Sequence, residues 1–438
     1  MPPRSNMSLS GVRKQYIQLN PVNAVSNGVY SPGSGIPLIK FDISSSAAPM
    51  FLQGDELRIN GKITCAGVTN TGKNFVDNFA GRFASCIDTI TISSKRLNQV
   101  IERVNNYWRV VPSVISALHG NEDLSTVLAH EGGHHQTNFL ARHEMVANQG
   151  NKGKSFSSRL YTGCLNSGQM MDLSQAGMGG LVIEILLKPN VSYVFGTDAA
   201  TNSSTFQLSD LTLTCPLYHT AAGAPNAETF AFNSLSTIFQ TVNSSTSVIA
   251  LTPGLKQVSS IFANFMNTSE IGNQSFNSCR LGNIGQVRAL RFSINGALNP
   301  LQYRLLTNEE ANDNLAPAGK QYRARCMIDR NYLEATNIDR WSNTGRTCLA
   351  WNAWNAGVID RSQTANNDGA SQGTANGVGI LYDHNGTGVD FSQQVFSMEL
   401  EASGDDLDGT AAKAQGCYLV FLNKNQIIMS QNGIEVIR

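Results

Sequence analysis

Charged side chains are scarce in this sequence: Asp, Glu, Lys and Arg make up 15% of its 438 residues, against about 25% in an average soluble chain. The 32 basic and 32 acidic residues cancel to a formal net charge of +0. A neutral chain is not expected to bind nucleic acid or an acidic membrane over its whole surface. Charge is also depleted at the cores of protein interfaces. The composition therefore fits either a surface largely covered by neighbouring molecules or a loop-rich β protein with uncharged loops.

Long hydrophobic runs and paired cysteines are also absent. The most apolar stretch, residues 181–187, contains Glu184 and ends at Lys188, far short of the roughly 20 residues of a membrane span. Residues 1–10 have no apolar core, so no secretory signal is expected. The eight cysteines occur singly, with no Cys-x-x-Cys. We expect them to be reduced, and to act as small hydrophobic residues within strands.

Alternation of apolar and polar residues is the strongest signal that is present. A period of two predicts half-buried strands of antiparallel sheets, and it occurs at residues 55–65, 210–215, 290–295 and 396–402. Near the end of the chain, two short apolar runs flank Asn432-Gly433, which predicts a hairpin. Long gaps rich in Gly, Asn and Ser separate the strands. They favour a β-sandwich with Greek-key connections.

Helix signals are few. A three-four spacing of apolar residues predicts a helix from Arg96 to His119, interrupted near Pro112. A shorter helix is predicted from Glu122 to His130, with Gly132-Gly133 as its stop. The predicted fold class is therefore all-β with a few short helices in loops.

The two halves of the chain repeat one order of elements. Strands at 87–93, 181–195 and 206–215 in the first half correspond to strands at 287–295, 395–402 and 417–423 in the second. Each unit spans about 130 to 140 residues, which is the size of a domain. The repeat predicts two tandem sandwiches joined near Pro216–Pro225. The expected divisions are an N-terminal arm at 1–35 that orders only against a partner, a first sandwich at 36–222 and a second at 223–438.

Four passages carry a resemblance to a known family: Ala84–Ser94, Asn98–Tyr107, Phe206–Thr214 and Gly416–Leu422. In this order the chain resembles the double jelly-roll major capsid proteins of DNA viruses. That lineage includes adenovirus hexon, the tectiviruses, the large cytoplasmic DNA viruses, and the polinton-like viruses and virophages, to which these passages are most similar.

The resemblance implies two tandem eight-stranded jelly-roll sandwiches and a non-enzymatic role. It implies homotrimers of pseudo-hexameric outline that tile an icosahedral shell around a DNA genome, in a virion assembled in the host nucleus or cytoplasm. Penton and minor capsid proteins are the implied partners, with no small-molecule substrate, cofactor or catalytic residue. The arm carries Arg4, Arg13 and Lys14. They are expected to face the genome or an inner membrane, or to be merely solvated.

One motif points to other chemistry. His130-Glu131-Gly-Gly-His134 satisfies H-E-x-x-H, in which two histidines one helical turn apart bind zinc and the glutamate activates water. A zinc-dependent hydrolase is therefore an alternative function.

Two features of the sequence weaken that alternative. The pair Gly132-Gly133 costs about 1 kcal/mol per glycine within a helix, so it fits a helix stop that separates the two histidines. The position six residues beyond the second histidine is Leu140 rather than a ligand, and His143 follows at irregular spacing. We therefore expect no metal site, with a polar loop at a subunit contact in its place. A second alternative is a glycan-binding or adhesion sandwich that uses Trp341, Trp351 and Trp354.

Overall fold

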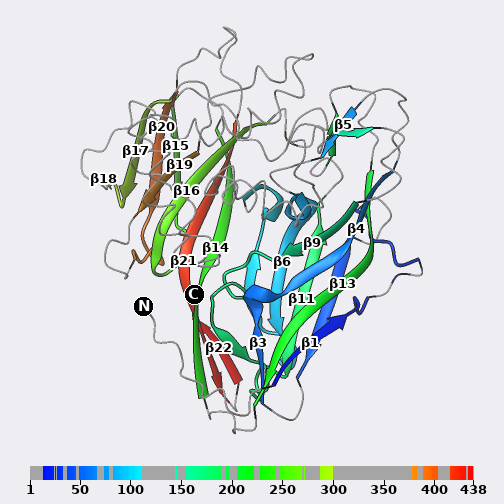
Figure 1. Ribbon diagram of the computed structural model, residues 1–438. Coiled ribbons are helices and arrows are strands. Elements are labelled where there is room, and N and C mark those ends of the chain that lie inside the picture. The colour runs from blue at the N-terminus through cyan, green and yellow to red at the C-terminus, as the bar shows by residue number, and fades with distance from the viewer. Residues whose placement is uncertain are drawn as a thin grey trace, which may run out of the picture.

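The computed structural model describes the chain in separate stretches. They are residues 13–110 and 227–268, each with short gaps, and 144–146, 154–188, 194–196, 205–220, 271, 287–298, 377–381, 388–402, 415–430 and 433–437. Strands account for most of these residues (Figure 1). No helix in these stretches has the length and apolarity needed to cross a membrane.

The first half of the chain forms two large antiparallel sheets and one small one. One large sheet has the order β10-β3-β13-β4-β9, with β1 also paired to β13, and the other has the order β2-β11-β6-β7. Their bounds are β1 Arg13–Leu19, β2 Leu38–Ser44, β3 Met50–Gln53, β4 Arg58–Ala66, β6 Ile87–Ser94, β7 Val100–Val104, β9 Lys154–Arg159, β10 Met170–Asp172, β11 Gly180–Leu187 and β13 Thr205–His219. The small sheet has the order β12-β5-β8, from β5 Asn74–Asp77, β8 Glu144–Val146 and β12 Val194–Gly196. Short 3-10 helices lie at Gly54–Glu56 (η1) and Arg82–Cys86 (η2).

The second half forms two further antiparallel sheets. The first has the order β14-β21-β16-β19, with β22 also paired to β21, and the second has the order β15-β20-β17-β18. The strands are β14 Ala227–Val242, β15 Thr246–Leu251, β16 Val258–Asn267, β17 Val287–Ile294, β18 Ala297–Leu298, β19 Gly377–Leu381, β20 Phe396–Ala402, β21 Gln415–Ser430 and β22 Gly433–Ile437. In the described residues no sheet mixes strands from the two halves.

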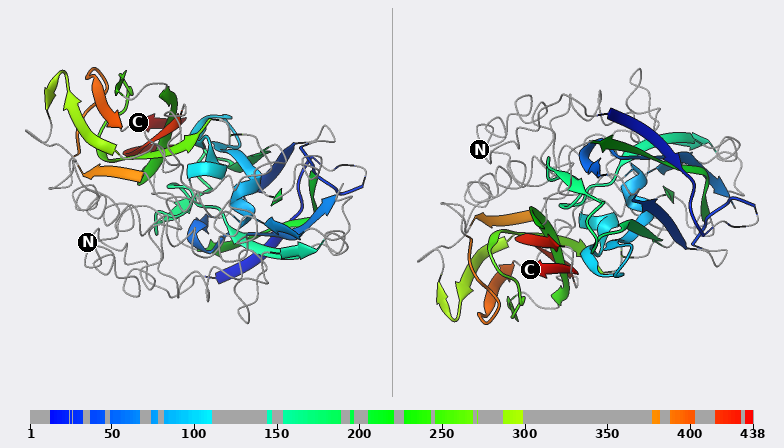
Figure 2. Two further views of the ribbon diagram at one scale, coloured as in Figure 1. Left: turned by 90° about the horizontal axis from the view of Figure 1, so that it is seen from above. Right: turned by 90° about the horizontal axis from the view of Figure 1, so that it is seen from below.

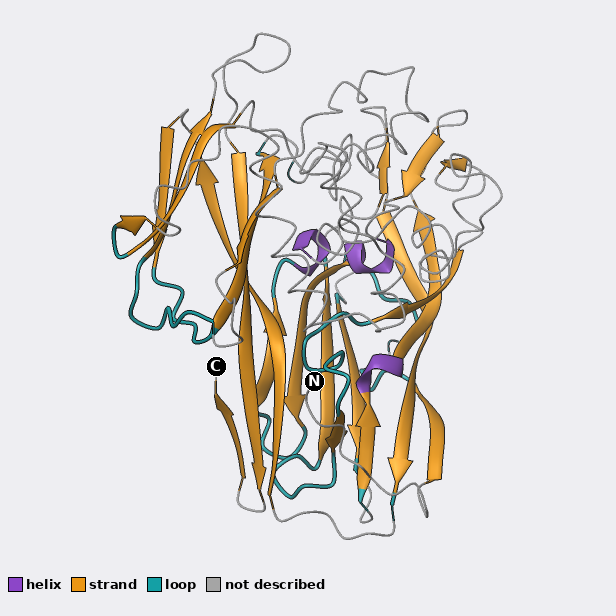
Figure 3. Cartoon of the chain, turned by 60° about the vertical axis from the view of Figure 1, so that its left-hand side comes forward, coloured by secondary structure: helices purple, strands orange, loops and turns teal. Residues whose placement is uncertain are grey.

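The two halves repeat one topology. In the first, β1, β13, β4 and β9 pair in the same order as β14, β21, β16 and β19 in the second. The sheets β2-β11-β6-β7 and β15-β20-β17-β18 correspond in the same way. In each half the first strand therefore pairs with a strand near the end of that half, as a jelly roll requires. This confirms the predicted all-β fold with two tandem jelly-roll sandwiches (Figure 3).

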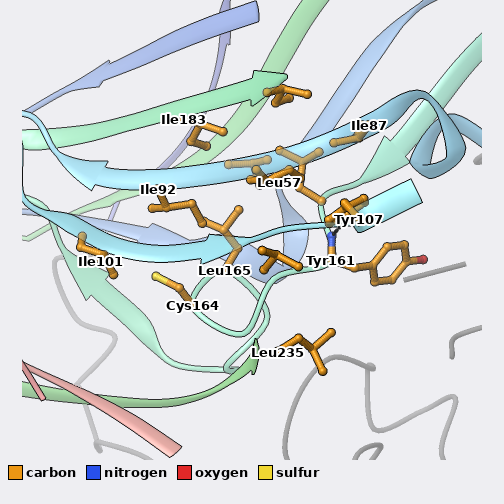
Figure 4. Packing of buried hydrophobic residues seen from close by; sticks show 14 of the residues in the cluster. Leu57, Ile87, Ile92, Ile101, Tyr107, Tyr161, Cys164, Leu165, Ile183 and Leu235 are labelled. Atoms are coloured by element: carbon orange, nitrogen blue, oxygen red, sulfur yellow. Dashed lines mark hydrogen bonds between the residues drawn. The ribbon is translucent and has the colours of Figure 1, made fainter. Parts of the chain in front are cut away.

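The core lies between the facing sheets of each sandwich. On β2 the side chains of Ile39, Phe41 and Ile43 are fully buried and alternate with partly exposed neighbours. This is the period of two that a sheet with one apolar face requires. The rings of Phe83 and Phe156 stack with centroids 4.5 Å apart. Figure 4 shows part of this buried cluster.

Most of the predicted strands are confirmed. The strand predicted at 55–65 is β4, preceded by the short helix η1, and that at 206–215 lies within β13. The hairpin predicted around Asn432-Gly433 is formed by β21 and β22, with Ser430 opposite Gly433.

The helix predicted from Arg96 is wrong over its first part. Residues 100–104 form β7, which pairs with β6, and the helix begins at Tyr107. Asn98 adopts a φ of 52°, a left-handed conformation suited to a tight connection and foreign to a helix interior. The backbone N–H of Ser94 bonds the carbonyl of Gln99 at 2.9 Å, which turns the chain back along β6. The apolar residues at 100–104 fit the spacing of a helix as well as that of a strand. Their pairing with β6 makes this segment a strand.

The expectation that residues 1–35 order only against a partner is wrong for β1. All seven residues of β1 pair with β13, from Arg13 opposite His219 to Leu19 opposite Leu213. Further along, Tyr30 exchanges backbone hydrogen bonds with Leu208 at 2.8 and 2.9 Å. The segment is therefore the first strand of the first sandwich, the counterpart of β14. The boundary expected at 222/223 stays a prediction.

The difference in burial between two positions on β11 predicts different losses of stability on substitution. Ile183 is 0% exposed and Leu186 is 36% exposed. Replacing Ile183 by Ala should lower the free energy of unfolding by about 2–5 kcal/mol, because it leaves a cavity. Leu186→Ala should cost less than about 1 kcal/mol. Urea unfolding followed by tryptophan fluorescence measures both, and equal losses would contradict the assigned core.

Candidate functional site

The described residues place the two sandwiches in direct contact along β7 and β14. β14 is an edge strand of its own sheet and β7 is an edge strand of the sheet β2-β11-β6-β7. Figure 1 shows β14 at the side of the second sandwich that faces the first. Viewed from above and below, the two sandwiches stand side by side (Figure 2). This contact decides how the two rolls are arranged, so it is the candidate functional site.

A buried carboxylate lies at the centre of this contact. Glu102 of β7 is 2% exposed. Its Oε1 accepts hydrogen bonds from the Gly163 N–H at 3.0 Å and the Ser234 Oγ at 2.6 Å. Its Oε2 accepts one from the Cys164 N–H at 2.7 Å. Ser234 belongs to β14 and the other two donors to the first sandwich, so one carboxylate ties together both halves of the chain.

Burial sets the acidity of this group. Removal from water raises the pKa of Glu102, while the hydrogen bonds from Ser234 and from the backbone of Cys164 and Gly163 oppose that rise. The same donors satisfy both oxygens, which a buried carboxylate requires. The geometry therefore gives Glu102 a structural role.

The backbones of the two sandwiches also come close together at this point. A Cβ atom on Gly163 would lie 1.7 Å from the carbonyl oxygen of Asn233 on β14, so only glycine fits there. Nearby, the Thr237 hydroxyl donates to the backbone carbonyl of Asn105 at 2.9 Å. Leu235 of β14 and Cys164, both labelled in Figure 4, belong to a buried cluster that has members in both sandwiches.

Aromatic and cationic side chains extend the contact beyond the end of β7. The rings of Trp108 and Tyr418 meet edge to face with centroids 6.1 Å apart. The guanidinium carbon of Arg109, itself 0% exposed, lies 5.8 Å from the centre of the Tyr418 ring. The ammonium of Lys188 lies 4.6 Å from the Trp108 ring. These distances suit cation–π attraction, which is stronger where water is excluded.

The first sandwich has a second, exposed edge at β1, on the side away from β7. β1 pairs with β13 on one side only in the described residues, and Tyr16 is 59% exposed. The Lys14 ammonium contacts the Glu56 carboxylate at 2.6 Å, and the Tyr16 hydroxyl donates to the same carboxylate at 3.0 Å. The ammonium also lies 5.1 Å from the Tyr218 ring. These contacts hold the strand in place and leave its outer edge free of other strands in the part of the chain described.

The metal-ligand candidates His130, His134 and His143 lie outside the described residues, as do Trp341, Trp351, Trp354 and Arg4. Within the described residues, no three His, Cys, Asp or Glu side chains gather as a metal site would need.

Four cysteines have described side chains, and all four are buried and form no disulfide: Cys86, Cys164, Cys215 and Cys417. Burial raises the pKa of Cys215 to about 12 and also raises that of Cys417. Burial, followed by the neighbouring charge of Glu102, raises the pKa of Cys164. These thiols pack as small hydrophobic groups, as the sequence predicts, because the reactive thiolate is disfavoured.

Sequence reasoning missed Glu102 because it placed residues 100–104 on a helix, where a glutamate is ordinarily solvated. The available signal was a single acidic residue among the β-branched residues Val100, Ile101 and Val104. It missed Gly163 and Ser234 because nothing in their local sequence marks a contact between segments 71 residues apart.

Three solved structures resemble this chain over nearly its whole length. The VP54 protein of PBCV-1, fitted into a reconstruction of the virophage Sputnik, matches with a TM-score of 0.59 at 10% identity, covering 98% of this chain and 97% of that one. The Faustovirus major capsid protein matches with a TM-score of 0.55 at 8% identity, covering 98% and 93%. The mavirus major capsid protein matches with a TM-score of 0.51 at 9% identity, covering 100% and 92%.

No protein-family model and no curated protein sequence matches this chain. At such low identity the structural likeness establishes the fold, which is the double jelly roll. It agrees with the topology repeated in the two halves.

The buried carboxylate makes a testable prediction. Glu102→Ala leaves two backbone N–H groups and a hydroxyl without their acceptor, so it should lower the free energy of unfolding by about 3–5 kcal/mol. Glu184→Ala is the matched control, because Glu184 is 34% exposed and pairs with Lys40 at 2.9 Å. That change should cost about 0–1 kcal/mol. Denaturant unfolding checks both, and a loss at Glu102 no larger than the control's would contradict its bridging role.

Proposed function

We propose that this chain is a major capsid protein that assembles as homotrimers into an icosahedral shell around a DNA genome. The observation that carries the proposal is the double jelly roll, shared along nearly the whole length with the Faustovirus and mavirus major capsid proteins. Two rolls that stand side by side form a building block for a shell, in which each copy contacts other copies. The proposed role is structural and non-catalytic, and its place is the virion.

The repeated topology supports a ring of subunits. Within one chain, the edge strand β14 of the second roll contacts the β7 side of the first. The counterpart of β14 in the first roll is β1, and the counterpart of β7 in the second roll is β18. If a neighbouring copy repeats the contact, its β18 side meets β1. Head-to-tail contacts of this kind close into rings, and three copies give six rolls of pseudo-hexagonal outline.

The composition fits the same proposal. With 32 acidic and 32 basic residues, many copies can pack laterally without long-range repulsion. We propose that the first roll runs from β1 to about residue 222 and that the second covers residues 223–438. The residues before β1, which include Arg4, are proposed to contact the genome or an inner membrane. Penton and minor capsid proteins are the further proposed partners.

Solution size provides the first test. The purified chain should elute and scatter light as a particle of about three times its 47.3 kDa mass, because each copy offers one β1 edge and one β18 side. Electron microscopy of the particles should show a pseudo-hexagonal outline. A strictly monomeric protein at micromolar concentration, with its fold intact by circular dichroism, would contradict the proposed assembly.

The exposed edge provides the second test. Tyr16→Glu puts a charge on the outer edge of β1, where the proposed ring buries it against a neighbour, so the variant should shift from trimer to monomer. Leu186→Glu is the control, because Leu186 lies on β11 in the opposite sheet, away from that edge. The second variant should remain trimeric. Analytical ultracentrifugation distinguishes them, and trimers from both variants would place the subunit contact elsewhere.

A further inference from the structure

The two sandwiches also meet near the start of β14, whereas the Glu102 contact lies at its middle. The segment between β10 and β11 packs against the hairpin strand β22, and a Cβ atom on Gly177 would lie 2.7 Å from the backbone carbonyl of Gly433. The side chain of Arg96 holds this segment from the other side, because its Nη1 donates to the Ala176 carbonyl at 2.9 Å. The contact is thus a close backbone fit that small shifts would disturb.

Two carboxylates from different sandwiches meet at this place. Asp172, at the end of β10, is 0% exposed. It accepts hydrogen bonds from the Ser174 N–H at 2.9 Å, the Ser174 hydroxyl at 2.5 Å and the Gln175 amide at 3.0 Å. Glu228, at the start of β14, lies beside Asp172, whose charge and backbone N–H both act on the Glu228 carboxylate.

The two carboxylates differ in how many hydrogen-bond donors surround them. Each oxygen of Asp172 accepts at least one hydrogen bond, Oδ1 from Ser174 and Oδ2 from Gln175. In contrast, the Oε2 of Glu228 is buried and has no hydrogen-bond partner among the described residues. A buried carboxylate oxygen without a donor is tolerated far better when the group is neutral than when it is charged.

We propose that Glu228, beside Asp172, makes this contact between the sandwiches responsive to pH, tight when Glu228 is protonated and weaker when Glu228 is ionised. The inference concerns the single chain and does not depend on the assembly proposed above. It rests on the close contact between the two sandwiches, on the hydrogen-bonded carboxylate of Asp172 on one side, and on the Glu228 oxygen without a donor on the other.

The charges around Glu228 support this assignment. Asp172 is the titratable group that acts on it across the contact. On its own sheet, β21 places the uncharged Met429 opposite it, and β22 carries the exposed Glu435. Arg96 approaches the same contact, but its guanidinium is engaged with a backbone carbonyl. Burial, followed by the charge of Asp172, raises the pKa of Glu228 to about 7, against the effect of the Asp172 N–H.

The sign of the effect follows from this shift. In the separated state Glu228 would titrate near its ordinary value of 4.5. The stability that the neutral group gives the contact is therefore complete below about pH 4.5 and is lost as the pH rises through about 7. Opening of the contact should become up to about tenfold more frequent between pH 6 and pH 8.

Hydrogen exchange followed by mass spectrometry tests the proposal on the full-length chain. After correction for the intrinsic pH dependence of exchange, amides in residues 172–180, 427–430 and 433–436 should exchange several-fold faster at pH 8 than at pH 6. Amides of β6, in the core, should not change. In Glu228→Gln, which resembles the neutral form in shape, the two pH values should give equal protection.

Glu435→Gln is the matched control, since it removes a carboxylate from exposed β22 and should leave the pH dependence intact. Asp172→Asn should move the midpoint of the transition to lower pH, although it also weakens the hydrogen bonds to Ser174 and Gln175. The proposal is overturned if wild type and Glu228→Gln show the same pH response, or if the wild-type contact exchanges equally at both pH values.

Discussion

The arrangement of this molecule depends on a single buried carboxylate that must be satisfied from both halves of the chain. Glu102 takes one hydroxyl donor from β14 and two backbone donors from the first sandwich. Because an unpaired buried charge is far more costly than a paired one, the sandwiches cannot slide or rotate without losing these bonds. The close approach of Gly163 to Asn233 adds a steric constraint at the same point. Together they fix a side-by-side placement that apolar packing alone would specify weakly.

The repeated topology explains how a fold can persist where the sequence does not. Each half needs alternating residues on its strands and a long strand, β13 or β21, that accepts partners on both sides. Many sequences meet these requirements, so capsid proteins of about 10% identity share the arrangement. The contacts between the halves are more specific, since they need the carboxylate of Glu102, the backbone of Gly163 and the hydroxyl of Ser234 next to one another.

The local sequence pattern predicted most of the strands but not the contacts between the two halves. The alternation in β4 and β13 and the Asn-Gly hairpin were predicted, because a sheet with one buried face imposes a period of two. The strand β7 was missed, because Val100, Ile101 and Val104 also satisfy a helical spacing and only pairing with β6 decides between them. The strand β1 was taken for an arm, because its partner β13 lies about 200 residues away in the sequence. The sequence marks Glu102 only as one acidic residue among β-branched neighbours and does not mark Glu228, since the roles of both arise only where distant strands meet.

Glu102 and Glu228 show how the same side chain can fix one contact and tune another. Both lie between the sandwiches, and burial raises the pKa of each. Glu102 has a donor for each of its oxygens, so ionisation leaves no acceptor unpaired and the contact it forms is stable as built. Glu228 has one oxygen without a donor and a second carboxylate beside it, so its ionisation acts directly against the contact. Glu102 of β7 bonds to the middle of β14, and Glu228 lies at the start of β14. The sandwiches can therefore stay joined at Glu102 while the contact at Glu228 loosens, which a uniformly apolar interface could not do.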